Sequence, residues 1–300
     1  MKILIIGGTG FIGKNLVPIL KDEHELFLFH RNEKNKIEGC KSLLGNRKNL
    51  FLFKSDIEDI SPDVVIDLIC YTAQEAWDSV NVVSDISANI IMISSGDVYQ
   101  AYDQFRGKSN QIATDALEET DNLRTCLFPY RDQAKGDPLL ENYDKILVET
   151  IIRSALEKRW TILRLGALFG EHDSQKKLQE YIAPMINNDS KVFLDQKKAK
   201  WRWTRGYIKN VVQAIKLVVN SPEKSNSEIF NVGNEETFAE LDLVRTIKNS
   251  LGWKGTVEVG DYPDGLNYDQ HLILNTQKIR RQLGYSDAYT IKEGILKTLK

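Results

Sequence analysis

Unbroken apolar runs recur along the first 165 residues and are separated by mixed segments rich in polar and charged residues. Runs in which polar residues do not alternate with apolar ones are typical of strands buried on both faces of a parallel sheet. We therefore predict a strand at each run. The runs are residues 2–6, 24–30, 49–53, 63–69, 88–94 and 160–165.

Amphipathic segments alternate with these runs and predict helices. One helix begins near Phe11, and a long one spans about residues 139–158. Pro18 is expected to kink or shorten the first helix near Lys14, because its ring collides with the carbonyl group four residues earlier. The alternation of strands and helices predicts an α/β fold with a doubly wound parallel sheet.

The pattern changes beyond Gly166, where shorter and more mixed segments predict a smaller C-terminal lobe. We expect residues 1–165 to form the sheet domain and residues 166–300 to form mainly the lobe, with about 200–235 returning to the sheet domain. The other expected elements are helices near 176–187 and 208–220, a helix that starts with a Thr237–Glu240 capping box and continues to Leu251, short strands around Val192 and Trp201, and a strand at 229–233.

Composition and charge exclude several classes of protein. The net charge is −2 and both signs are scattered along the chain, so no nucleic-acid or membrane partner is indicated. Cys40, Cys70 and Cys126 are few and far apart, which favours a reducing cytoplasm over a disulfide framework or a zinc site. The four histidines form no cluster, so no metal site is expected. We expect no secretory signal, because the first apolar run is too short, and no run of about 18 apolar residues is present that could span a membrane.

The first apolar run leads into a glycine-rich turn suited to binding phosphate. Gly8 and Gly10 allow a turn too tight for a Cβ atom, so backbone N–H groups can approach a pyrophosphate closely. Gly13 lets the following helix pack tightly on the strand. The preceding strand and following helix favour a dinucleotide site over an ordinary glycine-rich turn. The residues expected there are Gly7, Gly8, Thr9, Gly10, Phe11, Ile12 and Gly13.

Six motifs occur in an order that resembles the extended short-chain dehydrogenase/reductase family, in its NAD-dependent epimerase/dehydratase group. The resemblance covers nearly the whole chain. It implies a Rossmann domain that binds a nicotinamide cofactor, a smaller C-terminal substrate lobe, often for a nucleotide sugar, and an association of two copies as a homodimer. The motifs are GGTGFIG at 7–13, SDI at 55–57, SSGDVY at 94–99, RLGALFG at 164–170, FNVGNEET at 230–237 and LGY at 283–285.

The resemblance places further residues at the cofactor. Asp56, after the predicted third strand, matches an adenine-binding aspartate, and the following amide of Ile57 would donate to the adenine ring. A turn aspartate is the alternative interpretation. The fourth predicted strand ends with Leu68, Ile69 and Cys70 at the sheet edge that the cofactor is expected to cross. The alternative interpretation of these three residues is that they only pack in the core.

The residues at the end of the second predicted strand indicate whether NAD or NADP is preferred. Relatives that select NAD tend to have an acid there, whereas this chain has His30, Arg31 and Asn32. The Arg31 guanidinium matches the oxygens of a 2′-phosphate, so we expect NADP to be favoured over NAD. A solvated surface arginine is the alternative. Ser94 and Leu165, at the ends of two other predicted strands, are expected to line the same cofactor site.

Catalysis in the resembling family uses a Ser or Thr together with a Tyr that lies four residues before a Lys. The motifs place Ser95 and Lys145 at two of these positions and Glu141 at the tyrosine position. Tyr143 is expected to point away from that face, because two residues rotate a continuous helix by about 200°. Tyr130, in a long connection, is then the candidate phenol, and Glu141 is an acid or base if burial raises its pKa. The alternative for Glu141 and Lys145 is a pair of surface charges on a solvated helix.

Two functions stay open at this point. The first is an NADP-binding oxidoreductase or epimerase that acts on a small carbonyl, hydroxyl or sugar-derived substrate with an altered triad. The second is a non-catalytic NADP-binding regulator or an RNA-binding member of the same fold. The basic stretch 197–207 contains Arg202 and Arg205, weak candidates for binding a substrate diphosphate. With Trp201 and Trp203, the stretch could also stack on RNA or form a short edge strand.

Overall fold

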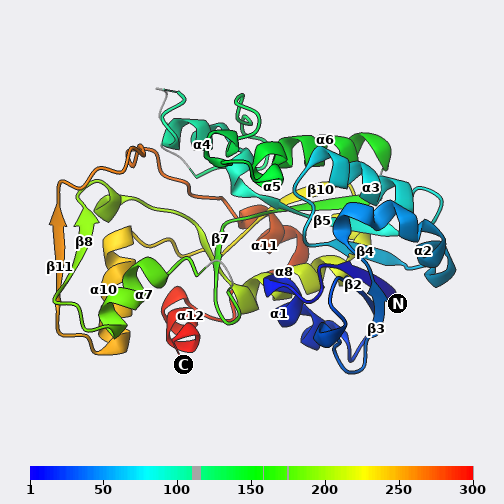
Figure 1. The fold of residues 1–300 in the computed structure, drawn as a ribbon, viewed down its shortest axis with the longest axis horizontal. Coiled ribbons are helices and arrows are strands. Elements are labelled where there is room, and N and C mark those ends of the chain that lie inside the picture. Colours follow the sequence, from blue (N-terminus) through cyan, green and yellow to red (C-terminus); the bar gives the residue numbers. More distant parts are fainter. Residues whose placement is uncertain (110–115, 158, 174–175, 300) are drawn as a thin grey trace.

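The structure is a computed structural model that describes residues 1–109, 116–157, 159–173 and 176–299. Its centre is a seven-stranded sheet with the strand order β10-β6-β5-β4-β1-β2-β3 (Figure 1). Every neighbouring pair is parallel, so the doubly wound α/β fold is confirmed. The strands are β1 (Lys2–Ile6), β2 (Glu25–His30), β3 (Lys41–Leu44), β4 (Val64–Asp67), β5 (Asn89–Ser95), β6 (Trp160–Leu165) and β10 (Glu228–Val232).

Helices cover both faces of this sheet and bury its apolar side chains. One core cluster joins the sheet to α1 and α8, and a second joins the opposite face to α3 and α6 (Figure 1). Burial on both faces explains why the strands read as unbroken apolar runs. The helices around the sheet are α1 (Phe11–Leu20), α2 (Lys54–Ile60), α3 (Ala73–Val83), α6 (Lys145–Ala155), α8 (Ile208–Asn220), α9 (Pro222–Ser225) and α11 (Gln277–Leu283).

The second lobe is built on a two-stranded parallel sheet, β8 (Lys191–Asp195) with β11 (Thr256–Gly260), at the left of Figure 1. Helices α7 (Gln179–Ile186) and α10 (Glu240–Leu251) lie beside it. A further pair of short strands, β7 (Ala167–Phe169) and β9 (Arg205–Tyr207), lies between this lobe and the main sheet. The remaining elements are α4 (Gln100–Phe105), α5 (Pro138–Asn142), α12 (Ile291–Thr298) and the short 3₁₀ helices η1 (Glu33–Asn35), η2 (Arg47–Phe53), η3 (Gly96–Val98), η4 (Arg131–Gln133) and η5 (Lys198–Lys200).

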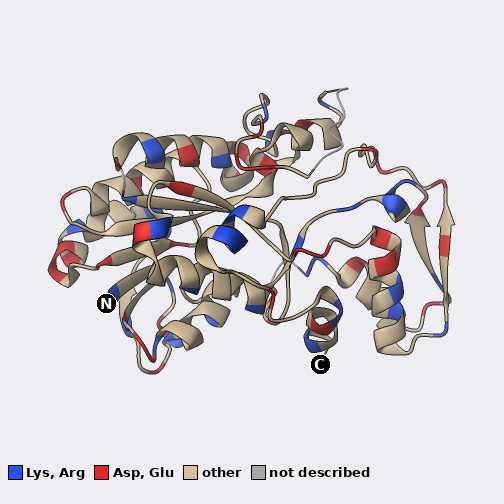
Figure 2. Ribbon diagram, turned by 180° about the vertical axis from the view of Figure 1, so that it is seen from behind, with Lys and Arg blue, Asp and Glu red and all other residues tan. Residues whose placement is uncertain are grey.

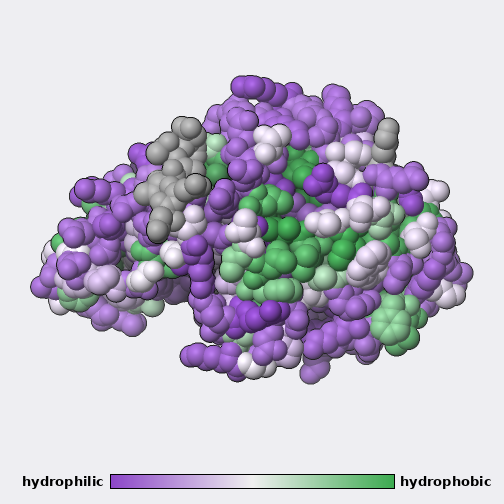
Figure 3. All heavy atoms as spheres, turned by 90° about the horizontal axis from the view of Figure 1, so that it is seen from above, coloured by the Kyte–Doolittle hydropathy of each residue, from purple (hydrophilic) through white to green (hydrophobic). Residues whose placement is uncertain are grey.

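Charge and apolar surface are distributed differently. Acidic and basic residues are interspersed over the elements of both lobes (Figure 2). Apolar side chains gather over the middle of the face seen from above, between hydrophilic rims (Figure 3). Within the described ranges, no helix has the length and apolar character that crossing a membrane requires. The described residues also contain no group of three or more His, Cys, Asp or Glu side chains placed to hold a metal ion.

The strand predicted at residues 49–53 is wrong, because this segment lies in the 3₁₀ helix η2. The Asn46 side chain accepts a hydrogen bond from the Lys48 amide at 3.1 Å and caps this helix. Phe51 and Leu52 are 50% and 65% exposed, whereas Leu50 is buried in the core, so only part of the apolar run enters the core. The third strand is the shorter and more polar β3 instead.

Three smaller expectations are also corrected. Helix α1 continues through Pro18 to Leu20, because its buried face is packed against the sheet on both sides of the proline. Helix α10 starts after Ala239 without a side-chain cap, so Thr237 and Glu240 do not form the predicted capping box. No regular strand forms around Trp201, where only isolated bridges occur.

Candidate active site

Three neighbouring cavities lie at the ends of the central strands, and we call them the glycine-loop, lysine and tyrosine cavities. Their volumes are about 790, 300 and 520 Å³, respectively. Gly7 and Gly10 line the first two, and Ser95 and Tyr143 line the last two. Tyr71 lines all three. The shared residues show that the three cavities adjoin one another.

The glycine turn is shaped for close approach of a ligand to the backbone. Gly7 has a φ of +86°, and a Cβ atom there would lie 2.8 Å from the Ile69 side chain. A Cβ atom on Gly13 would lie 2.3 Å from the Gly8 carbonyl, which confirms the tight helix–strand packing expected at Gly13. The positive φ is at Gly7 rather than at Gly8 or Gly10. Helix α1 follows with Gly10 as its N-cap and no side-chain hydrogen bond at that end. The residues present therefore fit a dinucleotide phosphate group.

The far end of the glycine-loop cavity is lined by the loops after β2 and β3, including the exposed Arg31 and Lys48. Arg47, which the sequence analysis did not select, is 5% exposed and lines the same cavity. Its Nη2 donates to Asp67 Oδ2 at 2.8 Å and to Ser79 Oγ at 2.7 Å. Its Nε and Nη1 atoms are buried without a hydrogen-bond partner among the described residues.

The adenine assignment of Asp56 and Ile57 rested on the strand that does not form. Both residues lie in α2, where Asp56 is exposed and Ile57 is buried in the core. Neither lines any of the three cavities. Gly45 and Asn46, which directly follow the true third strand, occupy the cavity wall instead.

The predicted strand-end residues lie together around the lysine cavity. Leu68, Ile69, Ser94 and Leu165 all line it. Cys70 is fully buried beside it and contributes its backbone carbonyl rather than its side chain. Burial raises the pKa of the Cys70 thiol well above its usual value, so this side chain is held as an unreactive thiol.

Lys145 is fixed in the wall of the lysine cavity as the first residue of α6. Its Nζ donates to the backbone oxygens of Cys70 at 2.5 Å and Ile93 at 2.7 Å. The same atom lies 4.7 Å from the centre of the Tyr71 ring. Burial lowers the pKa of the ammonium group, because these neutral partners replace water only in part. The surface ion pair considered for Lys145 is therefore not formed.

Tyr143 lies at the site, contrary to the expectation from helical rotation. The predicted helix 139–158 is interrupted between α5 and α6, where Tyr143 and Asp144 adopt extended backbone torsions. Asp144 caps α6 by accepting from the Ile146 amide, and its carboxylate pairs with buried Arg124 at 2.7 Å. The argument that Tyr143 faces away assumed a continuous helix. The break turns its ring toward Ser95 and Lys145, and all three residues line the lysine cavity.

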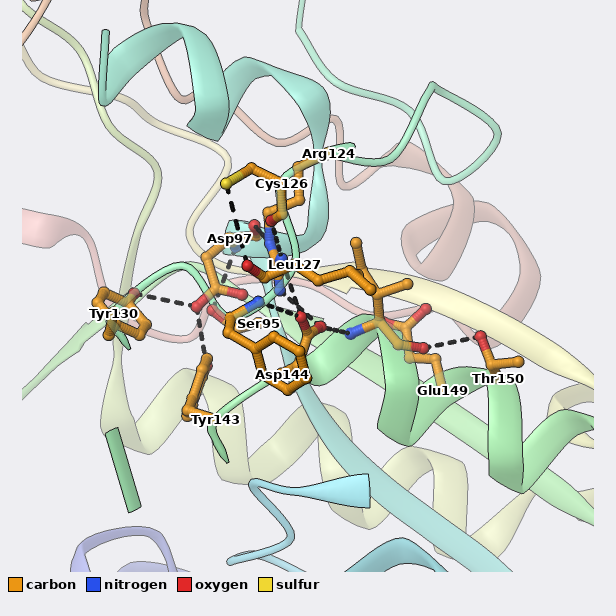
Figure 4. A network of polar contacts seen from close by, with 12 residues as sticks. Ser95, Asp97, Arg124, Cys126, Leu127, Tyr130, Tyr143, Asp144, Glu149 and Thr150 are labelled. Carbon is orange, nitrogen blue, oxygen red and sulfur yellow. Dashed lines mark hydrogen bonds and ion pairs between the residues drawn. The ribbon is translucent and has the colours of Figure 1, made fainter. Parts of the chain in front are cut away.

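Asp97 connects this tyrosine to Tyr130, as Figure 4 shows. The Tyr143 hydroxyl donates to Asp97 Oδ2 at 2.8 Å, and the Tyr130 hydroxyl donates to the same oxygen at 3.1 Å. The other oxygen, Oδ1, is buried without a partner among the described residues. Asp97 is 6% exposed, and burial raises the pKa of its carboxyl. Enclosure of the phenol end and the adjacent Asp97 charge raise the pKa of Tyr143 well above its usual value.

Tyr130, the candidate phenol from the sequence, lines the tyrosine cavity and belongs to the network of Tyr102, Tyr143 and Asp97. Glu141 belongs to α5, lines none of the three cavities, and borders a separate depression with Arg131 and Lys135. The register that assigned Glu141 to the tyrosine position failed for the same reason as the Tyr143 expectation, because no continuous helix joins it to Lys145.

The basic stretch 197–207 contributes less to the site than its composition indicates. Arg205 is buried, and its Nη2 donates to both carboxylate oxygens of Glu240 at 3.0 and 2.8 Å. Arg202 is exposed and, like Arg205, lines none of the three cavities. Trp201 is buried and stacks on Phe105 with ring centres 4.9 Å apart, so it is not available to a nucleobase.

Comparison with known proteins extends this picture. The sequence model of the NAD-dependent epimerase/dehydratase family matches residues 3–233. A search of curated proteins finds no match.

Solved structures with the same fold include sugar-nucleotide enzymes. A UDP-glucose 4-epimerase from Thermotoga maritima with UDP-glucose is 17% identical, covers 100% of this chain and 97% of its own, and has a TM-score of 0.76. A dTDP-glucose 4,6-dehydratase from Bacillus anthracis with NAD is 16% identical. The match covers 100% of this chain and 95% of the dehydratase, with a TM-score of 0.76. A UDP-glucuronic acid 4-epimerase from Bacillus cereus with UDP-glucuronic acid and NAD is 17% identical. The match covers 99% of this chain and 98% of that epimerase, with a TM-score of 0.75. At these identities the likeness concerns the fold.

Proposed function

Because the chain belongs to the NAD-dependent epimerase/dehydratase family, we propose that it binds a nicotinamide dinucleotide along the three cavities and oxidises or reduces a small hydroxyl or carbonyl substrate. The observation that carries this proposal is the meeting of Ser95, Tyr143 and Lys145 in one cavity that Gly7 and Gly10 also line. When bound, the cofactor supplies or accepts the hydride. The glycine turn would hold its linked phosphates.

The side chains around the lysine cavity supply proton transfer and hydrogen bonding. In the proposed reduction, the Tyr143 hydroxyl gives its proton to the substrate oxygen and becomes a phenolate, and in the oxidation this phenolate takes the proton from the substrate hydroxyl. Ser95 donates a hydrogen bond to the same oxygen and stabilises the developing negative charge. The raised pKa of Tyr143 keeps the phenol protonated and suits it to the donor role. Lys145 supplies positive charge within the same cavity.

We also propose that NADP is favoured over NAD. Arg31 and Lys48 both line the end of the glycine-loop cavity that lies away from Ser95 and Lys145. Two cations at that position would hold a 2′-phosphate, and the described part of the cavity wall places Glu75 as its one carboxylate. Two of the three solved structures above are complexes with NAD, so the preference is a distinct claim about this chain.

Titration calorimetry with both cofactors tests the binding proposal. We expect NADP to bind more tightly than NAD, and Arg31→Ala to weaken NADP about tenfold or more, equal to about 1.4 kcal/mol, while leaving NAD unchanged. Lys34→Ala, an exposed lysine of η1 outside the cavity wall, is the matched control. Tighter binding of NAD, or an NADP preference that persists in Arg31→Ala, contradicts the assignment.

The alternative of a non-catalytic NADP-binding regulator was favoured by the absence of a tyrosine from its expected position. Since Tyr143 lies beside Ser95 and Lys145, that argument no longer applies. An RNA-binding role would need exposed aromatic side chains over basic ones. Trp201 is buried, and Lys197 and Lys198 pair with Asp269 and Glu180. No specific observation therefore favours the alternative over the enzyme.

A further inference from the structure

The tyrosine cavity differs from the other two in the character of its wall. Besides the residues that it shares with the lysine cavity, it is lined mainly by aromatic and branched apolar side chains. These are Tyr102, Tyr130, Trp203, Leu139, Leu140, Leu272 and Leu274. With a volume of about 520 Å³, the cavity has room for a compact molecule with an apolar body.

The charged groups in this wall are few. Among the described residues that line the tyrosine cavity, Lys177 is the one cation and Asp97 is the one carboxylate. The Lys177 ammonium lies 5.6 Å from the centre of the Trp203 ring. The Asp173 carboxylate, which accepts from the Lys177 amide at 3.2 Å, also acts electrostatically on this ammonium. The charges that act on Lys177 are those of Asp173, Arg205 and Asp97, in decreasing order, so what relates Lys177 to Asp97 is mainly that both line this cavity.

Two arginines of the basic stretch 197–207, Arg202 and Arg205, do not line this cavity. Arg205 is held by Glu240, which also accepts from the Tyr181 hydroxyl at 2.8 Å. Releasing Arg205 would leave the Glu240 carboxylate buried without a counter-charge, which is costly. Arg202 donates to the Thr237 carbonyl at 3.4 Å and lies outside the cavity. A diphosphate carries at least two negative charges, and one lysine beside a carboxylate compensates them poorly.

We propose that the tyrosine cavity binds a small hydroxy or oxo acid with a single negative charge and an apolar body, rather than a nucleotide-diphosphate sugar. Lys177 pairs with the acid group, and Trp203 with the leucines holds the body. Asp97 Oδ1, buried and without a partner in the described structure, accepts from a substrate hydroxyl. This inference rests on the proposed function for the reaction itself.

The position of Lys177 limits where the acid group lies on the substrate. Lys177 lines the tyrosine and lysine cavities together with Ser95 and Tyr143. The acid group is therefore expected within a few bonds of the oxygen that Tyr143 and Ser95 bind. An aromatic 2-hydroxy acid has this arrangement.

Calorimetry with matched probes tests the substrate class on the full chain, with and without bound NADP. The probes are mandelate, its neutral methyl ester and UDP-glucose. We expect mandelate to bind about tenfold or more tightly than the ester, the effect of one well-placed ion pair, and UDP-glucose to bind less tightly than mandelate. Lys177→Met should remove the difference between mandelate and the ester. Lys177→Arg should retain it.

Lys176→Met is the matched control, because Lys176 is exposed like Lys177 but lines none of the three cavities. Tighter binding of UDP-glucose than of mandelate overturns the inference. So does a ratio of mandelate to ester affinity that is unchanged in Lys177→Met, or the absence of saturable mandelate binding up to its solubility. If mandelate binds as expected while neither nicotinamide cofactor does, the proposed function fails and the inference about the cavity stands.

Discussion

At the scale of single residues, the site depends on the contact between a tyrosine and a carboxylate. Tyr143 donates to Asp97 at 2.8 Å, and Tyr130 donates to the same oxygen. This arrangement holds the Tyr143 hydroxyl in one direction and keeps its proton in place until a substrate oxygen competes for it. The sequence motifs identified Ser95 and Lys145, but they did not identify Asp97 within SSGDVY.

Tyr143→Phe removes the proposed proton donor and retains the ring. We expect turnover of NADPH with an accepted carbonyl substrate to fall by about 10²- to 10⁴-fold, the usual contribution of a general acid. NADPH affinity should change little, because the phenol contributes no phosphate or ribose contact in this proposal. Reduced nicotinamide absorbance measures the first quantity, and calorimetry measures the second.

Tyr262→Phe is the control for this substitution, because Tyr262 lies in the second lobe and bonds Glu258 away from the cavities. Turnover that persists in Tyr143→Phe would contradict the role of Tyr143. It would then indicate Tyr130, the phenol predicted from sequence, as the donor.

Asp97 also gives the stability of the protein a definite dependence on pH. Burial raises its folded-state pKa, so the folded protein holds this proton to a higher pH than the unfolded chain does. The stability that protonated Asp97 contributes is fully present below the ordinary Asp pKa. It is lost as pH rises through the raised folded-state pKa, by about 1.4 kcal/mol for each pKa unit by which that pKa is raised.

Urea unfolding of the wild type and Asp97→Asn over a pH series measures this effect. The free energy of unfolding of the wild type minus that of the variant should fall as pH rises. Asp242→Asn, an exposed residue of α10, controls for the loss of an ordinary carboxylate. A difference that rises with pH would show that Asp97 is stabilised as an anion instead.

At the scale of elements, the break between α5 and α6 positions the site. Asp144 is fully buried, caps α6, pairs with Arg124 and accepts from the Phe128 amide at 2.7 Å. The Asp144 amide in turn donates to the Tyr71 carbonyl at 3.0 Å. These contacts fix the extended backbone that turns Tyr143 into the cavities.

Asp144→Ala is therefore expected to cost about 3–5 kcal/mol of stability, because it leaves the buried Arg124 charge unpaired. Asp137→Ala is the matched comparison, since Asp137 caps the short helix α5 with a hydrogen bond to the exposed Leu139 amide. We expect about 0.5–2 kcal/mol there. Chemical denaturation measures both values. Equal small losses would mean that the Arg124–Asp144 pair does not hold this segment.

Most elements could be predicted from the sequence, and the failures have local causes. Strands buried on both faces gave unbroken apolar runs at 2–6, 88–94 and 160–165, and the structure has strands there. The run 49–53 looked the same but begins after Asn46, whose side chain caps a 3₁₀ helix. Helical periodicity over 139–158 concealed an interruption that depends on the partner of Asp144, an arginine 20 residues away. Contacts of this kind are not visible in a local pattern.

The site could be predicted in part for the same reasons. Glycine residues and strand ends are local features, so Gly7, Gly10, Ile69 and Ser94 were selected and line the cavities. Tyr143 and Asp56 were misplaced because each assignment depended on the element next to it. Asp144 before an amphipathic segment was an N-cap signal that could have placed the start of α6 at Lys145.

At the scale of the whole molecule, the three adjoining cavities are lined by the glycine turn and by residues at the ends of strands of the main sheet, including Ser95 and Leu165. A cofactor held there contacts loops from several strands at once, so it should stabilise the folded chain. At NADP concentrations 100-fold above its Kd, we expect the free energy of unfolding to rise by about 2.7 kcal/mol. Urea unfolding with and without NADP measures this rise. Unfolding curves that coincide would contradict cofactor binding to the folded chain.

A crystal structure of the NADP complex tests the central claim most directly. We predict that the phosphates lie on the glycine turn at Gly7 and Gly10, and that the nicotinamide ring lies in the lysine cavity with its reactive carbon facing Tyr143 and Ser95. A nicotinamide ring bound away from these two residues, or a cofactor that does not reach the glycine turn, would contradict the account.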